Sequence, residues 1–295
     1  MFRYKSCGKI NSFLNVLRKL PNGYHQITTH YQLIDIFDEI EYEENPIDEI
    51  ETNANLGPKN NSIFEAINWF NHKFNKNQRF KVKLKKNIPI GAGLGGGSSN
   101  CATTLKFLCK YHGENLNSLN LEDICFSLGA DVPVFLKGSS SYAEGCGEIL
   151  KDKYSSTSTY LLLIPNIFVS TAKIFNSKHL SFDKKLDKSK NSLLSALLLE
   201  DEMFKKHYFG LESLLGAHTF QKIKLSGSGS AMFIQDPDKE EIDIIFNKIE
   251  NNFRVFQVKA LEYYHENMGV SPSGKAEAFD ASMRRFESYH PSHNI

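Results

Sequence analysis

The 295-residue sequence contains no apolar run long enough to cross a bilayer, and its start, MFRYKSCGKINSF, lacks the apolar core of a signal peptide. It is also short of net charge, because 35 Lys and Arg are balanced by 34 Asp and Glu. A chain without a broad positive field is poorly suited to bind nucleic acid or a membrane surface. We therefore predict neither partner, and any anionic ligand must be held by local groups.

Cysteine is also scarce, and its five copies show no C-x-x-C spacing. An odd set of this kind favours a reducing compartment over a disulfide framework, so we predict a cytoplasmic protein. The histidines lack metal-ligand spacing, and no zinc site is predicted. The cysteines are Cys7, Cys101, Cys109, Cys125 and Cys146.

The chain is long for one domain and shows no internal repeat or low-complexity tract. Its pattern predicts an α+β fold, with strands in the first forty residues, a helix over 61–74, a strand at RFKVKLKK, and mixed elements in the second half. The polar segment 151–159 marks a boundary, which gives domains at 1–154 and 155–268. The polar, weakly periodic remainder, 269–295, is expected to be a loosely attached tail.

Asp131 is expected at a corner between a helix and a strand. The helical stretch LEDICFSLG ends at Gly129. Pro133 then predicts that regular helix does not continue.

The most informative segment is NIPIGAGLGGGSSN, which carries five glycines in seven positions between a predicted strand and a predicted helix. Glycine lets a backbone wrap closely around a ligand, and the free amides at a helix start attract phosphate. The hydroxyls of Ser98 and Ser99 add groups for phosphate or a hydrated metal. The segment therefore predicts a phosphate-binding loop. Its glycines are Gly91, Gly93, Gly95, Gly96 and Gly97.

Other interpretations of this loop fit less well. Its G-x-G-x-x-G spacing suggests a dinucleotide site, but such a site follows the first strand and needs an acidic residue about twenty positions on, where Leu116 stands. No Gly-Lys-Ser/Thr follows it, so it is not a Walker A loop. A flexible linker rarely lies between a strand and a helix. A second glycine cluster, LSGSGS at 225–230, is explained equally well by a tight hairpin.

Five segments in this order, GKINSFLNV, NGYH, IPIGAGLGGGSSNCATTL, GADVPVF and LSGSGSAMF, resemble those of the GHMP kinases, the group of galactokinase, homoserine kinase, mevalonate kinase and phosphomevalonate kinase. The resemblance covers residues 1 to roughly 265. It implies a two-domain GHMP kinase fold, with a ribosomal-protein-S5-like N-terminal domain and an α+β C-terminal domain. The motifs are most similar to the branch that uses ATP and Mg²⁺ to phosphorylate the 2-hydroxyl of a cytidine diphosphate-linked methylerythritol in non-mevalonate isoprenoid biosynthesis.

The resemblance implies a role for each part of the ATP site. Asp131 matches the family's catalytic aspartate and would accept the proton of the substrate alcohol. Lys9 matches the catalytic lysine, although Cys7-Gly8 precede it where the family commonly has Pro-Ala. Asn61 matches a position near the adenine pocket, but a helix N-cap explains it more simply. The residues that match the ATP loop are Pro89, Ile90, Gly91, Ala92, Gly93, Leu94, Gly95, Gly96, Gly97, Ser98 and Ser99.

The resemblance also implies a substrate site. Tyr24 would stack on the cytosine and His25 would hydrogen-bond its edge, since aromatic faces bind any base and polar edge contacts choose one. Phe175 lies where the family has a second aromatic over the base, but packing into the second domain explains it as well. The other matched positions are Asn11, Gly227 and Ser228. The family's Asn-Asp in the second domain is replaced by Glu200-Asp201, which leaves substrate contacts there open.

Three alternatives remain open from the sequence: another GHMP small-molecule kinase of the mevalonate or homoserine type, a non-catalytic nucleotide-binding protein of this fold, and a dinucleotide-dependent oxidoreductase. NGYH together with Asn11 argues against the first, and Lys9 with Asp131 argues against the second. The magnesium ligands are not determined by spacing. The oligomeric state, monomer or homodimer, is also left open.

Overall fold

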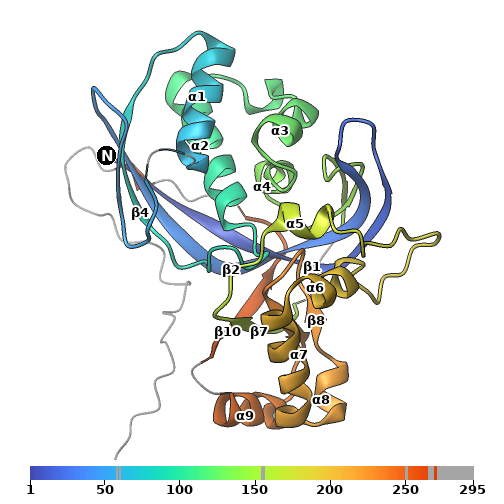
Figure 1. Ribbon diagram of the computed structural model, residues 1–295. Coiled ribbons are helices and arrows are strands. Elements are labelled where there is room, and N and C mark those ends of the chain that lie inside the picture. Colours follow the sequence, from blue (N-terminus) through green and yellow to red (C-terminus); the bar gives the residue numbers. More distant parts are fainter. Residues whose placement is uncertain (58, 60, 154–156, 250–251, 265–268, 271–295) are drawn as a thin grey trace, which may run out of the picture.

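The computed structural model describes residues 1–57, 59, 61–153, 157–249, 252–264 and 269–270 (Figure 1). Helices and strands are mixed along the chain, which confirms the predicted α+β class. The described strands are β1 (Phe2–Lys19), β2 (His25–Glu44), β3 (Glu49–Thr52), β4 (Phe80–Lys85), β5 (Ser141–Glu144), β6 (Ile149–Asp152), β7 (Thr159–Pro165), β8 (Lys224–Leu225), β9 (Met232–Gln235), β10 (Phe253–Leu261) and β11 (Gly269–Val270). The described helices are α1 (Ser62–Phe74), α2 (Gly96–His112), the 3₁₀ turn η1 (Leu116–Ser118), α3 (Leu121–Leu128), α4 (Val132–Lys137), α5 (Thr171–Phe175), α6 (Leu193–Glu200), α7 (Glu202–Leu215), α8 (Ala217–Gln221) and α9 (Lys239–Lys248).

The sheet is assembled on β2, whose 20 residues pair antiparallel with β1, β4, β5 and β10 in different parts of their length. Through β10 the sheet continues in the order β11-β1-β2-β10-β7-β9-β8, with β3 beside β4 and β6 beside β5. One sheet therefore joins the two halves of the described chain. Within these residues, no helix combines the length and apolar character that a bilayer crossing requires.

The pairing of β1 with β2 decides which side chains meet. Lys9 lies opposite Leu33, and Asn11 lies opposite Tyr31. Because alternate residues of a strand share a face and directly opposed residues project to the same side, Lys9, Asn11 and Tyr31 share one face of the sheet.

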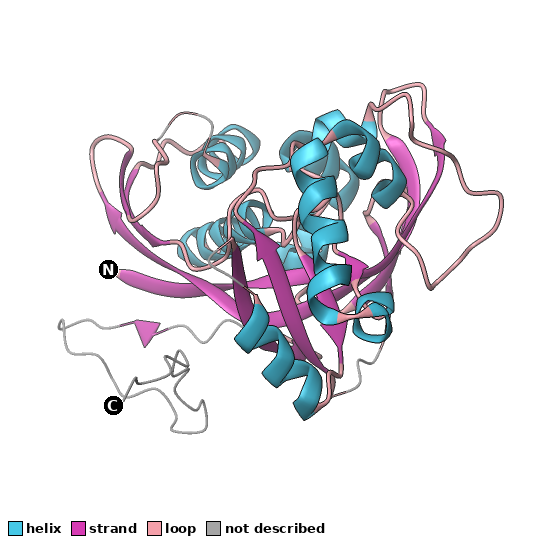
Figure 2. Cartoon of the chain, turned by 60° about the horizontal axis from the view of Figure 1, so that its bottom comes forward, coloured by secondary structure: helices cyan, strands magenta, loops and turns pink. Residues whose placement is uncertain are grey.

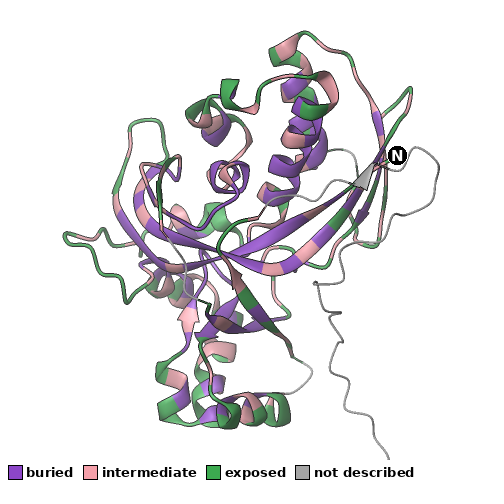
Figure 3. Cartoon of the chain, turned by 180° about the vertical axis from the view of Figure 1, so that it is seen from behind, coloured by how far each residue is buried: buried purple, intermediate pink, exposed green. Residues whose placement is uncertain are grey.

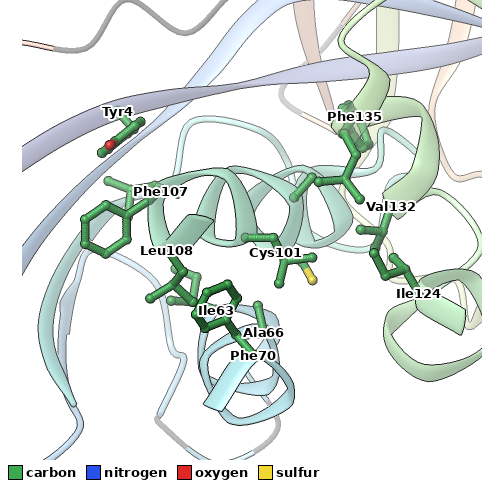
Figure 4. Close-up of a cluster of buried hydrophobic side chains, with 14 of the residues drawn as sticks. Tyr4, Ile63, Ala66, Phe70, Cys101, Phe107, Leu108, Ile124, Val132 and Phe135 are labelled. Carbon is green, nitrogen blue, oxygen red and sulfur yellow. The ribbon is translucent and has the colours of Figure 1, made fainter. Parts of the chain in front are cut away.

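The first hydrophobic core lies between the long strands and α1 to α4, which Figure 1 shows above β1 and β2. Helix α2 is its centre: Figure 4 shows Cys101 and Leu108 toward α1, and Phe107 toward Tyr4 of β1. The Phe107 ring stacks on Tyr42 with 4.2 Å between ring centroids. Each large side chain buried in this way contributes about 1.5–3 kcal/mol, so this core fixes α2 and the loop that precedes it.

A second core is formed by the helices of the other half, α5 to α9, against β7, β8 and β9. In Figure 2, which looks from below, helices lie across one face of these strands. Figure 3 shows the outward faces of the lower helices mostly exposed, whereas the strands behind them are largely buried. Phe204 and Leu211 of α7 are fully buried in this core.

A third core joins the two halves directly beneath the glycine loop. It combines Ile10 and Ile34 of the long strands with Tyr160, Leu162 and Phe233 of β7 and β9. Positions 91–97 of the loop contribute their two non-glycine residues, Ala92 and Leu94, to the same core. The loop is therefore anchored where the two halves meet.

The predicted corner after Gly129 is wrong in one respect, because the chain enters helix α4 and not a strand. Pro133 lies in the first turn of α4, where proline is tolerated since that N–H has no partner within the helix. Asp131 is the residue immediately before this helix and therefore lies between two helices.

The predicted domain boundary near residue 155 falls on residues 154–156, which lie outside the described residues, and it stays a prediction. Of the predicted polar tail, only Gly269–Val270 is described, as a short strand that pairs with Phe2 and Arg3 of β1. The rest of that tail also lies outside the described residues.

Candidate active site

The glycine loop lines a pocket of about 380 Å³ that begins near α1 and ends at Asp131. Nearly all of its lining comes from the first half of the chain, and Thr171 of α5 is the contribution from the second half. The lining residues are Leu56, Asn61, Ser62, Glu65, Leu84, Lys86, the loop residues from Pro89 to Ser98, Asn100, Asp131 and Thr171. Ser99, the last predicted loop residue, is buried inside α2.

At Ala92 and Leu94 the backbone of the loop, and not the side chain, lines the pocket. Ala92 and Leu94 are buried in the core on the other side, so these two predicted ligand residues can contribute only main-chain atoms. Gly91, Gly93 and Gly95, which alternate with them, adopt positive φ, as a tight reversal of the chain requires. Gly95 then caps α2 without a side-chain hydrogen bond, which leaves the first amides of this 17-residue helix available to an anion.

Gly93 is enclosed by the backbone of the second glycine cluster. A Cβ atom there would lie 2.5 Å from the carbonyl oxygen of Ser226 and 3.0 Å from that of Gly229, at a φ of +74°. The two glycine clusters are therefore in direct contact, and the backbone N–H of Ala231 also donates to the Ala92 carbonyl at 3.0 Å. The second cluster is thus part of the site as well as a hairpin.

Lys9 lies at the centre of these contacts. Its side chain is 3% exposed, and its Nζ donates to Asn11 Oδ1 at 2.7 Å and to the Gly93 carbonyl at 2.9 Å. The same Nζ lies 3.1 Å from Asp131 Oδ2. Asn11 is held in turn by Thr29, whose Oγ1 accepts from Asn11 Nδ2 at 2.8 Å. The ammonium group is therefore fixed between the ATP loop and the carboxylate, as a catalytic lysine would need to be.

Asp131 is the exposed member of this pair, with 29% of its side chain accessible. It precedes α4 but makes no side-chain capping bond to that helix, so its carboxylate is free of the usual structural role. Its exposure toward the pocket leaves an oxygen accessible to a substrate hydroxyl.

A buried ion pair that was not predicted from the sequence supports the entrance of the loop. Asp38 of β2 is fully buried, accepts the backbone N–H groups of Asn87 and Ile88 at 2.8 and 2.9 Å, and pairs with Lys86. The Lys86 ammonium lies beside Gly96 at the start of α2. A carboxylate with this many donors fixes the backbone that leads into the glycines.

Gly227 and Ser228 lie on the other side of the lysine. A Cβ at Gly227 would be 3.2 Å from Asn11 Oδ1 and 3.4 Å from Lys9 Nζ, so this position must stay small. Ser228 Oγ is hydrogen-bonded to Thr171 Oγ1 at 2.8 Å, which links the second glycine cluster to the pocket wall.

Two of the predicted base-binding residues, His25 and Phe175, are in ring contact at the start of β2, whereas the ring of Tyr24 packs on Phe126. His25 lies 5.3 Å from the ring of Phe175 and 6.2 Å from that of Phe182. Tyr24 donates through its hydroxyl to the Phe126 carbonyl at 3.1 Å and leaves its ring partly exposed. Burial, and then the charge of Lys19, lower the pKa of His25, so its imidazole is neutral near pH 7 and able to both donate and accept.

Asn61 takes the capping role that the sequence favoured and also lines the pocket. Its Oδ1 accepts from the Ile63 N–H at 3.0 Å at the start of α1. Its Nδ2 is buried without a hydrogen-bond partner in the described part of the chain. An unpaired buried donor in a pocket wall is a suitable contact for a ligand acceptor.

Sequence reasoning missed several members of the site because they carry no local pattern. Lys86 is one basic residue of an alternating strand, and Asp38 is one acidic residue among several at the end of β2. Thr171 and Phe182 lie in segments that lacked a motif. The structure identifies them only by bringing them beside the predicted residues.

The region 61–139 matches the family model described as GHMP kinases N terminal domain. A 4-diphosphocytidyl-2-C-methyl-D-erythritol kinase of Francisella tularensis subsp. tularensis (strain FSC 198) is 34% identical over 278 residues, which is 89% of this chain and 98% of that protein. The kinase of the same name from Haemophilus ducreyi (strain 35000HP / ATCC 700724) is 34% identical over 266 residues, or 86% and 92% of the two chains. A crystal structure of a 4-(cytidine 5'-diphospho)-2C-methyl-D-erythritol kinase superposes with a TM-score of 0.70 at 23% identity, covering 88% of this chain and 98% of that one.

Proposed function

The chain belongs to the 4-diphosphocytidyl-2-C-methyl-D-erythritol kinase family of the GHMP kinases, and we propose that it transfers the γ-phosphoryl group of ATP to the 2-hydroxyl of that cytidylated alcohol. The observation that carries this proposal is the contact of Lys9 with both Asp131 and the Gly93 carbonyl, which joins an acid–base pair to a phosphate-binding loop. Such an arrangement supplies the positioning and charge stabilisation that phosphoryl transfer requires.

The reaction follows from the positions of these groups. Asp131 accepts the proton of the substrate hydroxyl as its oxygen forms a bond to the γ-phosphorus of ATP. The bond between the γ-phosphorus and the oxygen that bridges it to the β-phosphate breaks, and ADP leaves with that oxygen. Lys9 remains charged and stabilises both the carboxylate and the phosphoryl group in transit.

ATP fits the pocket with its phosphates against the glycine loop and the first amides of α2. The opposite end of the pocket, with Leu56, Leu84 and the unpaired Asn61 Nδ2, then receives the adenine. The phosphate chain runs toward Asp131, which is where the acceptor must meet it.

A magnesium ion is expected with ATP, and the residues fit a metal held mostly by phosphate oxygens and water. Among the described residues, no group of three or more His, Cys, Asp or Glu forms a ready-made metal site. The pocket lining has two carboxylates, Asp131, which is paired with Lys9, and Glu65 in the first turn of α1. The ion would neutralise charge on the phosphates.

The acceptor is expected to lie along β2, with its base between Tyr24, His25 and Phe175. His25 and Tyr31, whose ring centre lies 5.7 Å from Lys9 Nζ, are six residues apart on one strand, up to roughly 20 Å at 3.3 Å per residue. A substrate whose base and reacting alcohol are at opposite ends suits that separation. A small acceptor such as mevalonate or homoserine would leave the aromatic group without a ligand.

We expect Tyr24→Ala to weaken binding of the acceptor without changing the binding of ATP. The reason is that stacking on an aromatic ring contributes roughly 1–3 kcal/mol per base. The KM for the cytidylated alcohol should rise about 5- to 100-fold, while the KM for ATP stays within twofold. Tyr24→Phe keeps the ring and removes the hydroxyl that donates to the Phe126 carbonyl, so it separates the contributions of the two groups. An unchanged acceptor KM in Tyr24→Ala would remove the tyrosine from the base site.

We also propose that the enzyme works in the cytoplasm. All five cysteines lie in described residues, where each is buried and none forms a disulfide. Free thiols are the usual state in a reducing compartment. Sedimentation equilibrium would distinguish between the two oligomeric states left open for the enzyme, monomer and homodimer.

A further inference from the structure

A second polar cluster lies on the opposite face of β1 and β2 from Lys9. Successive side chains of a strand alternate between the two faces, so His30 of β2 points away from the face that carries Lys9 and its own neighbour Tyr31. The register of β1 against β2 shifts between residues 11 and 13, and Ser12 is the extra residue of this bulge. Its Oγ lies 2.6 Å from His30 Nδ1. The bulge thus fixes the orientation of the His30 ring.

The second ring nitrogen of His30 has no partner in the described part of the chain. The side chain is 3% exposed, and its Nε2 is buried without a hydrogen bond. The two nitrogens of an imidazole point in nearly opposite directions, so Nε2 points away from Ser12 and β1. On the other side of β2, His30 pairs with Tyr142 of β5, and their ring centroids lie 5.2 Å apart. A buried polar group is costly when unpaired, so this nitrogen calls for a partner on the Tyr142 side.

Two lysines converge on the same tyrosine ring. Lys153, which follows β6, places its Nζ 4.8 Å from the ring centre of Tyr142. Lys188, from the segment between α5 and α6, places its Nζ 4.9 Å from that centre. The imidazole and the two ammonium groups therefore surround one ring, although they come from three separate parts of the chain.

The charge of these two lysines is not balanced within the cluster. In the residues that the structure describes, neither lysine forms an ion pair with a carboxylate. The acidic residues beside them in the sequence bond elsewhere. Asp152 pairs with Lys137 at 2.8 Å. Asp187 accepts the Ser189 N–H at 2.9 Å. Like charges held beside one ring repel each other, and a negatively charged ligand would remove that repulsion.

His30 adds a neutral donor to the two cations. Burial first, and then the charges of Lys153 and Lys188, lower the pKa of His30 to about 3, so its ring is neutral near pH 7. With the Ser12 hydroxyl donating to Nδ1, the one proton of the neutral ring is on Nε2. The cluster then offers two ammonium groups and one N–H to a ligand.

We propose that Lys153, Lys188 and His30 form a binding site for a phosphate group, on the face of the sheet opposite the catalytic lysine. The two ammonium groups neutralise the anion, and the His30 Nε2–H donates to one of its oxygens. Phosphate suits this set better than a carboxylate does, because it carries up to two negative charges and offers at least three acceptor oxygens. The group belongs either to free inorganic phosphate or to a small phosphate monoester.

Calorimetric titration of the full chain with inorganic phosphate tests the site. Mg²⁺ and a non-hydrolysable ATP analogue fill the ATP pocket first, so that phosphate cannot bind there, and chloride keeps the ionic strength constant. We expect one phosphate per chain. Lys153→Gln and Lys188→Gln should each weaken its Kd about 5- to 50-fold, since each removes a charge-assisted hydrogen bond. In a parallel titration with glycerol phosphate, tighter binding than that of the free ion would identify an organic phosphate as the ligand, and weaker binding would identify inorganic phosphate.

Lys151→Gln is the matched control, because it removes the same charge two residues from Lys153. The Lys151 Nζ pairs with Glu144 at 2.9 Å, so this variant should leave the Kd for phosphate within twofold of the wild type. The site is overturned if the wild type binds no phosphate, if Lys153→Gln and Lys188→Gln keep its affinity, or if Lys151→Gln loses as much affinity as Lys153→Gln.

The part played by His30 is tested by ¹⁵N NMR of the imidazole rings. Phosphate should move one Nε2 resonance among those of the 10 histidines. That resonance should be absent in His30→Gln and should stay in place in Lys188→Gln, which changes only an exposed side chain. If phosphate moves no histidine resonance in the wild type, or moves the same one equally in Lys188→Gln, the histidine is not part of the site.

Discussion

Asp131→Asn is expected to lower kcat by about 10²- to 10⁴-fold, the range that a positioned general base contributes. The amide keeps the size of the carboxylate but cannot accept the proton of the substrate hydroxyl. Lys9 keeps its bonds to Asn11 and to the Gly93 carbonyl, so the ATP loop should remain in place. The measurement is steady-state ADP release with Mg-ATP and the cytidylated alcohol, together with ATP affinity by calorimetry.

Asp123→Asn provides the control for that variant. Asp123 lies in α3, near Asp131 in the sequence, but its carboxylate is exposed and, among the described residues, pairs with the exposed Lys73. Surface pairs of this kind contribute little to stability, so this variant should keep its kcat. Turnover by Asp131→Asn within threefold of the wild type would remove the aspartate from the mechanism.

Gly93→Ala should have the second largest effect. We expect kcat/KM for ATP to fall on the order of 10²-fold, because a small displacement of the groups that hold a substrate can lower the rate by that factor. The added methyl group would lie 2.5 Å from the Ser226 carbonyl oxygen, and backbone on both sides prevents it from moving aside. The loop must then shift away from the second glycine cluster, and Lys9 loses its fixed acceptor at Gly93.

Gly113→Ala separates this clash from conformational strain. Gly113 ends α2 with φ of +69°, close to the +74° of Gly93, but nothing lies within 4 Å of the added Cβ. Both variants carry the strain of an L residue at positive φ, roughly 1–2 kcal/mol. Both should therefore melt earlier than the wild type, while only Gly93→Ala should lose ATP affinity. Equal kinetics in the two variants would contradict the packing of the two glycine clusters.

Local requirements made the glycine loop predictable from the sequence. Positive φ, close backbone approach and a helix start all require particular residue types at fixed spacing, and Gly93 and Gly95 satisfy them visibly. The first two strands were also predicted where β1 and β2 lie, because their apolar residues and the turn at 21–25 are local signals.

Long-range packing explains what the sequence did not predict. The pair of Asp38 with Lys86 joins positions 48 residues apart, and each residue alone resembles an ordinary surface charge. Tyr31 belongs to no motif of the sequence, and the β1–β2 register places it on the same face as Lys9. Helix α4 was missed because proline was interpreted as a helix breaker, although the first helical turn tolerates it.

The central claim is that this chain phosphorylates a cytidylated alcohol and no smaller acceptor. The most direct measurement is coupled ADP release from Mg-ATP with four samples: the cytidine diphosphate-linked methylerythritol, mevalonate, homoserine, and no acceptor. We predict turnover with the first alone, at a rate well above the acceptor-free sample. Turnover with mevalonate or homoserine in its place, or none with any acceptor from folded protein that binds ATP, would contradict the account.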